Sequence, residues 1–264
     1  MILLLAGTSD GRQLMKQLAS LFQNNPHVAG YYEGMIVSTL TPYGQSLVED
    51  DEGGPFVSVL SGGFDQSEMV QLIESRGIQL IIDATHPYAV NVSTNAIEAA
   101  QKTQIHYLRY ERPLSLVNAS ESVVFFEHYF EIIDYLKTRS GNVLLTTGSN
   151  NLMVFEPIIQ QKRVYARILP TAMALNKAQE AGLTPDRIVA VQGPFSARMN
   201  EAMLAEWTIR YLVTKDSADV GGFQEKVESA KQMGATCLVL KRPSIAYGKV
   251  FNNQGELIDY LSRV

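Results

Sequence analysis

Short apolar runs of strand length alternate with amphipathic stretches of helical length along most of this chain. The runs span residues 2–6, 35–39, 57–60, 79–83 and 105–109 in the first half, and 123–126, 143–147, 164–168, 188–191, 211–214 and 236–241 in the second. Helix-like segments separate them, most clearly at 11–22, 66–76 and 89–103. Because parallel strands need a long crossover, usually a helix, this alternation predicts an α/β fold with mainly parallel sheets.

A polar stretch at 115–122 interrupts the alternation, which resumes at residue 123. The 264 residues suffice for one large domain or for two smaller ones with cores of their own. We therefore expect a domain boundary near residues 114–120.

Composition and charge exclude several classes of function. The net charge of −5 and a pI near 5.5 leave no basic stripe for nucleic acid. The apolar start at residues 1–6 is too short for a signal or membrane segment, so we expect a cytoplasmic enzyme with no membrane partner. Cys237 is the only cysteine and lies in an apolar run, which predicts a buried strand thiol. The dispersed His27, His106 and His128 predict no protein-bound metal.

The segment Asp83-Ala84-Thr85-His86-Pro87-Tyr88-Ala89 follows a predicted buried strand directly. Open α/β sheets build their sites at the carboxyl ends of strands, so the chemistry is expected here. Histidine is the only side chain in this segment whose reference pKa lies near neutrality, which would suit His86 to proton transfer or hydrogen bonding to a ligand. The alternative is structural, with Nδ1 of His86 donating a hydrogen bond that fixes the turn before Pro87.

The first strand runs into Ala6-Gly7-Thr8-Ser9-Asp10-Gly11-Arg12, which opens a helix. Glycine allows close approach of a phosphate, and the helix N-terminus offers free N–H groups, so this loop fits a pyrophosphate cradle. It lacks the full G-x-G-x-x-G pattern, and a plain turn with Ser9 or Asp10 as N-cap is the alternative. Ser38 and Thr39 end the second strand without an acid or arginine, which leaves NAD or NADP open.

Two arginines, Arg109 and Arg112, stand at or just beyond the end of the fifth run. Their planar forks suit recognition of carboxylates, and pairing with Glu111 or another acid is the alternative. Three polar turns at 146–149, 192–196 and 214–217 each follow a predicted strand, so they should line one edge of a second sheet. Gly221-Gly222 precedes a predicted helix and adds a candidate anion-binding N-terminus.

The ordered set AGTSDGR, DATHPYA, YLRYERP, TTGSNN, ARILP, QGPFS, VTKDS and LKRP closely resembles the precorrin-6A reductase family of cobalamin biosynthesis. The resemblance implies two Rossmann-like domains, at 1–115 and 116–264, with a tetrapyrrole held in the cleft between them. It also implies reduction of the C18=C19 double bond by hydride from NADH or NADPH. The segment VSTLTPYGQSL is more similar to the cobalt-precorrin-6A branch, associated with NADH, than to the NADPH-dependent branch that reduces metal-free precorrin-6A.

The resemblance also implies roles for individual residues. The first domain would hold the cofactor, and the second would contribute to tetrapyrrole binding. The expected cofactor-binding residues are Gly7, Thr8, Ser9, Asp10, Arg12, Ser38, Thr39 and Thr85. His86 and Tyr88 are the candidate catalytic residues, with bound water as another proton source. The expected substrate-binding residues are Arg109, Arg112, Thr147, Gly148, Ser149, Arg167, Lys215, Asp216, Ser217, Gly221 and Gly222.

Some positions depart from the usual pattern of the family. Ala6 stands where the family usually has the first glycine of Gly-Gly-Thr, and Asp10-Gly11 replaces Glu-Ala. Asn150 replaces a frequent lysine, and Ala218 replaces a usual glycine, which puts backbone contacts near Ser217 in doubt. Two other classes of protein were considered. A short-chain-type dehydrogenase would need a well-placed Tyr-x-x-x-Lys pair, which the chain lacks, and a non-catalytic tetrapyrrole carrier would need no dinucleotide cradle.

Overall fold

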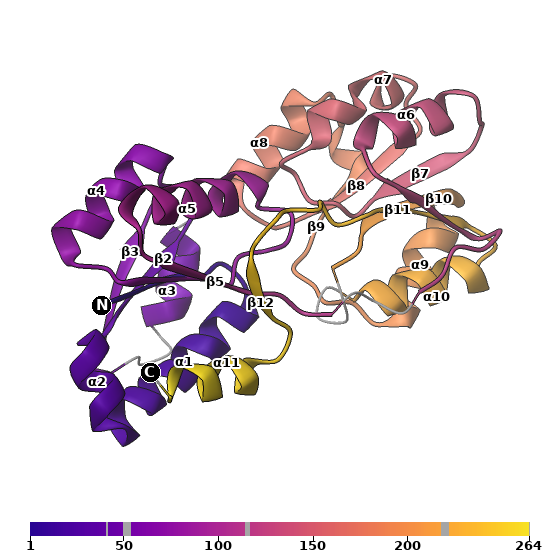
Figure 1. The fold of residues 1–264 in the computed structure, drawn as a ribbon. Helices are drawn as coiled ribbons and strands as arrows, with labels where there is room; N and C mark the ends of the chain where they lie inside the picture. Colours follow the sequence, from indigo (N-terminus) through magenta and orange to yellow (C-terminus); the bar gives the residue numbers. More distant parts are fainter. Residues whose placement is uncertain (41, 50–53, 114–116, 218–221, 264) are drawn as a thin grey trace. The chain divides into compact units, whose positions relative to one another are not determined.

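The computed structural model describes residues 1–40, 42–49, 54–113, 117–217 and 222–263. The chain divides into two compact units, Met1–Pro113 with Pro243–Val264, and Leu114–Arg242. Each unit contains a sheet of six parallel strands with helices packed against it (Figure 1). The predicted α/β class with mainly parallel sheets is therefore confirmed.

The first unit is built around the strand order β3-β2-β1-β4-β5-β12. Its elements in chain order are β1 (Ile2–Leu5), α1 (Ser9–Asn24), α2 (Pro26–Tyr32), β2 (Met35–Thr39), α3 (Pro42–Glu49), β3 (Val57–Ser61), α4 (Gln66–Arg76), β4 (Leu80–Asp83), α5 (Val90–Thr103), β5 (His106–Tyr110), β12 (Lys249–Phe251) and α11 (Gln254–Leu261). This is the order of a doubly wound dinucleotide-binding sheet, with the switch point between β1 and β4.

Alternation along β1 explains how the first sheet is covered on both faces. Ile2 and Leu4 pack with the apolar side of α1 and with α11, whereas Leu3 and Leu5 pack with α4 and α5. Figure 1 shows α4 and α5 together on one face and α1 and α11 on the other. Because both faces are covered, the strand is a continuous apolar run, as its sequence indicated.

The second unit repeats this arrangement with the strand order β6-β11-β10-β7-β8-β9. Its elements are β6 (Val123–Phe126), α6 (Tyr129–Lys137), β7 (Asn142–Leu145), the 3-10 helix η1 (Leu152–Phe155), α7 (Glu156–Ile159), β8 (Val164–Ile168), α8 (Ala172–Glu180), the 3-10 helix η2 (Pro185–Arg187), β9 (Ile188–Ala190), α9 (Ala197–Glu206), β10 (Ile209–Lys215), α10 (Phe223–Gln232) and β11 (Thr236–Leu240). The switch point of this sheet lies between β7 and β10. Cys237 is fully buried in β11, as predicted.

The last strand corrects the predicted extent of the second domain. Residues 116–264 were assigned to it as one piece, but β12 pairs in parallel with β5, so Pro243–Val264 belongs to the first unit. In the second sheet the corresponding edge position beside β11 is filled by β6. A strand of three residues is too short to show a hydrophobic pattern, and its pairing with a strand far away in sequence cannot be predicted from neighbouring residues. Within the described ranges, no helix has the length and apolar character needed to cross a bilayer.

Candidate active site at the switch point of the first sheet

The loop after β1 forms the tight turn into α1 that the sequence predicted. Thr8, not Ser9 or Asp10, is the N-cap, and its hydroxyl accepts the backbone N–H of Gly11 at 3.1 Å. The hydroxyl also donates to the carbonyl of Ala84, 3.2 Å away in the loop after β4. A methyl group on Gly7 would meet nothing within 4 Å, so the backbone is open there. This exposed helix N-terminus is suited to an anionic group such as a pyrophosphate.

Gly11 and Arg112 fix the position of this turn. A Cβ on Gly11 would lie 2.9 Å from the Cβ of Ala6, so glycine permits the close packing of α1 on β1. The Arg112 guanidinium pairs with Asp10 and lies 3.5 Å from the hydroxyl of Ser9. Arg112 could have faced a ligand carboxylate or paired with an acid of the chain. The structure shows the pairing, and the acid is Asp10.

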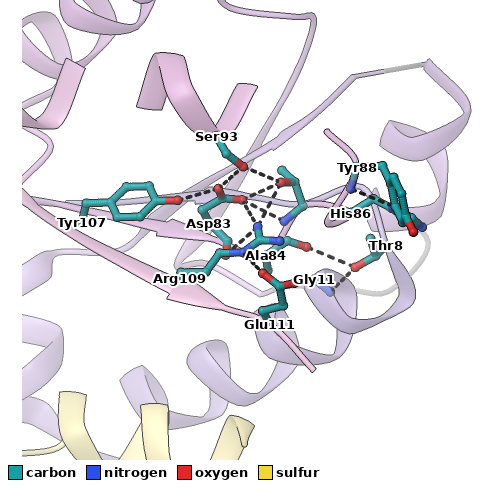
Figure 2. Close-up of polar contacts among 11 residues, drawn as sticks. Thr8, Gly11, Asp83, Ala84, His86, Tyr88, Ser93, Tyr107, Arg109 and Glu111 are labelled. Atoms are coloured by element: carbon teal, nitrogen blue, oxygen red, sulfur yellow. Dashed lines mark hydrogen bonds and ion pairs between the residues drawn. The ribbon is translucent and has the colours of Figure 1, made fainter. Parts of the chain in front are cut away.

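Asp83 gathers five hydrogen bonds at the end of β4 (Figure 2). Its Oδ1 accepts the N–H and hydroxyl of Thr85 at 3.0 and 2.6 Å and Nη1 of Arg109 at 2.7 Å. Its Oδ2 accepts the hydroxyls of Ser93 at 2.6 Å and Tyr107 at 2.7 Å. Burial and the neighbouring Asp83 carboxylate raise the pKa of Tyr107, so its hydroxyl remains a donor.

Arg109 is fully buried and is committed to acids of its own unit. It contacts Asp83 at 2.7 Å and Glu111 at 3.2 Å, and its guanidinium stacks 4.7 Å from the centre of the Tyr247 ring. Burial disfavours its charge, but attraction to these neighbours, Asp83 first, outweighs burial and raises the pKa of Arg109. The predicted role of Arg109 in holding a ligand carboxylate is thereby corrected, because its fork is turned into the interior.

A cavity of about 500 Å³ lies at the carboxyl edge of this sheet. Its lining comes from the loops after β1, β2, β3 and β4 and from the start of α5. Of the predicted site residues, the lining includes Gly7, Ser38, Thr85, His86 and Tyr88. The lining also includes residues that the sequence motifs did not predict, although the Gly-Gly pair follows a predicted strand: Leu40, Gly62, Gly63, Phe64 and Asn95.

The turn after β4 brings His86 and Tyr88 together at the cavity. Their ring centres lie 5.5 Å apart, and the backbone N–H of Tyr88 donates to Nδ1 of His86 at 3.3 Å. Nδ1 therefore accepts, rather than donates as the structural alternative supposed, and Nε2 of the neutral ring carries the proton. Thr39 is buried at the end of β2, and Arg12 lies in α1; neither lines the cavity.

The second unit carries polar turns at the matching edge of its own sheet. Thr147 and Gly148 follow β7, and Gly148 has φ of +80°, a conformation that favours glycine. Lys215 ends β10, and its burial lowers its pKa. Ser217 has a buried hydroxyl without a hydrogen-bond partner among the described residues. The predicted lining of one sheet edge therefore holds for these turns, and Ser149 follows Gly148 in the same loop.

Other predicted residues of this unit have internal partners. Asp216 forms an ion pair with Arg242, with 3.7 Å between Oδ1 and Nη2, and its backbone carbonyl accepts from Nε of Arg242 at 3.0 Å. Arg167 is buried, donates to Asn200 at 2.7 Å and stacks 4.1 Å from the Phe195 ring centre, and burial lowers its pKa to about 10. Gly222 caps α10 with φ of +62°, whereas Gly221 and Ala218 lie outside the described residues. Lys226 of α10 is also buried, and its helical sequence context does not predict this.

Comparison with known proteins decides the family of this chain. The model of the family described as Precorrin-6x reductase CbiJ/CobK matches residues 1–262. The chain belongs to this family of reductases. Two relatives are named Cobalt-precorrin-6A reductase. The relative from Priestia megaterium is 35% identical to this chain, and the match covers 99% of this chain and 98% of the relative. The relative from Salmonella typhimurium is 32% identical, and the match covers 99% of this chain and 95% of the relative.

A solved structure titled CobK precorrin-6A reductase superposes with a TM-score of 0.75 at 21% identity, covering 99% of this chain and 96% of that one. At this identity the match establishes a common fold. The family resemblance seen in the sequence motifs is confirmed, and the chain is an oxidoreductase of the precorrin-6A reductase type.

Proposed function

We propose that this chain reduces the C18=C19 double bond of cobalt-precorrin-6A with hydride from NADH, in the biosynthesis of cobalamin. Membership of the reductase family and the names of the relatives at 35% and 32% identity support the substrate. The observation that carries the cofactor assignment is the cavity at the β1–β4 switch point, which is lined by Gly7, in the loop that leads into α1, and by His86 and Tyr88. A cytoplasmic location, expected from the sequence, is part of this proposal.

The residues around the cavity fit a dinucleotide. The open backbone at Gly7 and the N–H groups in the first turn of α1, where Ser9 lies, would hold the pyrophosphate. Ser38, the second-last residue of β2, lies at the place where a ribose is normally held. When bound, the nicotinamide supplies the hydride. The protein binds and orients it, and the apolar Leu5, Phe64 and Val92 in the lining keep water from the reacting atoms.

The charge of the lining favours NADH over NADPH. Among the described residues that line the cavity there is no lysine or arginine. A 2′-phosphate on the ribose is normally held by a cationic side chain near the end of the second strand. Leu40 stands there instead, 71% exposed, just after the buried Ser38 and Thr39.

The remaining predicted residues suit the substrate. His86 Nε2–H and the hydroxyl of Tyr88 are proton sources at the cavity, for the carbon next to the one that accepts hydride. Thr147, Gly148, Ser149, Lys215 and Ser217 would bind the macrocycle from the second unit, since the substrate is rich in carboxylates. Leu169 and Val191, which follow β8 and β9 and are 51% and 41% exposed, offer apolar contacts to its ring.

The test is anaerobic oxidation of NADH and NADPH, followed by absorbance, with cobalt-precorrin-6A and metal-free precorrin-6A offered in parallel. NADH oxidation with the cobalt substrate is the expected result. Preferred NADPH oxidation with the metal-free substrate would move the chain to the other branch. Tight binding of the macrocycle without oxidation of either nucleotide would identify a carrier and overturn the proposal.

A matched pair of glycine variants locates the nucleotide. Gly7→Ala and Gly30→Ala each add a methyl group that meets no atom within 4 Å, and neither glycine has positive φ. Gly7→Ala should weaken NADH binding about tenfold, because the methyl group occupies the space of the pyrophosphate. Gly30→Ala, in α2, should leave it unchanged; equal affinities in both variants would place the nucleotide elsewhere.

A further inference from the structure

Asp83 is buried from solvent and does not line the cavity, yet it contacts groups that shape the cavity wall. Its side chain is completely buried, and it is not part of the lining. Thr85, which does line the cavity, gives both its N–H and its hydroxyl to Oδ1 of Asp83. Thr85, at the start of the turn that carries His86 and Tyr88, is therefore fixed by two hydrogen bonds to one carboxylate oxygen.

The other oxygen of Asp83 accepts from the helix that follows this turn and from the neighbouring strand β5. Oδ2 accepts from Ser93, one turn into α5, and from Tyr107 on β5. The carboxylate thus ties the beginning and the end of the turn to the neighbouring strand, as Figure 2 shows. With five donors on two oxygens, a shift of the turn would break charge-assisted hydrogen bonds to a fully buried carboxylate.

Arg109 makes this buried carboxylate tenable. A carboxylate buried alone is strongly disfavoured, and the register of β4 with β5 sets Arg109 directly beside Asp83. Nη1 of Arg109 also donates to the hydroxyl of Thr85 at 3.1 Å. The guanidinium therefore supports the same turn and compensates the charge of Asp83.

The network reaches the nucleotide loop through the backbone of Ala84. Its N–H donates to the carbonyl of Leu5 at 3.0 Å, and its carbonyl accepts from the hydroxyl of Thr8 at 3.2 Å. Thr8 is the N-cap of α1. The nucleotide loop after β1 and the turn after β4 are therefore connected by the hydrogen bond between Thr8 and Ala84.

From this geometry we infer that Asp83, buried with Arg109, is a positioning residue that sets the Thr85–Tyr88 turn against the nucleotide loop. The inference rests on the proposed function of the cavity. It assigns Asp83 no contact with cofactor or substrate. Its effect on reduction passes through the placement of Thr85, His86 and Tyr88.

The test compares Asp83→Asn with Glu111→Gln in the full chain. Each substitution removes one carboxylate charge beside Arg109 with little change in shape, but it is the carboxylate of Asp83 that accepts the N–H and hydroxyl of Thr85 in the turn. Both variants should have a lower Tm. Asp83→Asn should also raise the Kd for NADH about fivefold and lower kcat, because the turn loses charge-assisted bonds. Glu111→Gln should keep the Kd of the parent. An unchanged Kd in a folded Asp83→Asn variant would overturn the inference.

Ser93→Ala is the second variant, used if Asp83→Asn does not fold. It removes one donor to Asp83, leaves the ion pair intact, and does not touch the cavity. Hydrogen exchange in the absence of ligand should become faster at Thr85 and at Ala89, whose N–H is bonded to the carbonyl of His86. Exchange equal to the parent would overturn the positioning role. Failure of the parent protein to bind NADH would instead overturn the proposed function. The two outcomes are distinguishable because hydrogen exchange reports the stability of the turn in the absence of a nucleotide.

Discussion

Gly11→Ala should destabilise the first unit, although alanine normally favours a helix. The added Cβ would lie 2.9 Å from the Cβ and 3.0 Å from the Cα of Ala6. Carbon atoms pack best at about 3.5–4.0 Å, so α1 would have to move away from β1 by about 0.5–1 Å. Overpacking of this kind costs about 1–3 kcal/mol, against a gain of up to about 1 kcal/mol from replacing a helical glycine.

The neighbouring residue explains why this chain has glycine at position 11. In the motif that this chain resembles, glycine stands at the place of Ala6 and alanine at the place of Gly11, so here the two residue types have exchanged places. Since the two Cβ positions are 2.9 Å apart, only one of them can carry a methyl group at this helix–strand distance. Ala6→Gly together with Gly11→Ala should therefore restore much of the stability that Gly11→Ala loses.

A double-mutant cycle measures this exchange. The free energy of unfolding is obtained from urea titrations, with hydrogen exchange of peptides from β1 and α1 reporting the first unit. We expect a coupling energy of about 1–2 kcal/mol in favour of the double variant. Gly30→Ala in α2, which adds a methyl group in open space, is the control and should show no coupling with Ala6→Gly. Additive effects at positions 6 and 11, within about 0.5 kcal/mol, would refute the steric argument.

Two further predictions concern the second unit. Burial, and then the charge of Arg167, lower the pKa of Lys226 from 10.5 to about 8. The unfolded chain binds the proton of Lys226 more tightly, so stability should rise with pH from about 8 to about 9, above which loss of the Cys237 proton from the unfolded chain opposes the rise. Lys226→Met should abolish the rise and stabilise the unit at pH 7 by up to about 3 kcal/mol. The free energy of unfolding is measured by urea titration of the fluorescence of Trp207, and a parent protein without the rise would contradict this prediction. Burial raises the pKa of Cys237 to about 12. Iodoacetamide at pH 8 should therefore leave Cys237 unmodified in the native chain and label it in urea, and labelling of the native chain would refute this.

The alternation of the sequence determined most of the secondary structure of this protein. The predicted runs at 35–39, 123–126 and 164–168 coincide with β2, β6 and β8. Strands buried on both faces are continuous apolar runs, and these can be recognised without knowing their neighbours. The placement of polar loops at the carboxyl edges of the sheets followed from the parallel arrangement alone, which is why Gly7, Thr85 and His86 could be predicted to meet.

Only the tertiary structure decided which strands pair and where the charged side chains point. β12 has three residues and no sequence signal of its own, and its pairing with β5 brings the end of the chain into the first unit. Arg109 is 26 residues from Asp83 and becomes its neighbour through the register of β4 and β5. The sequence determined that an arginine and an acid would stand at the same sheet edge. Whether the arginine faces a ligand or the interior depends on packing between distant segments, and here that packing makes Arg109 the internal partner of Asp83.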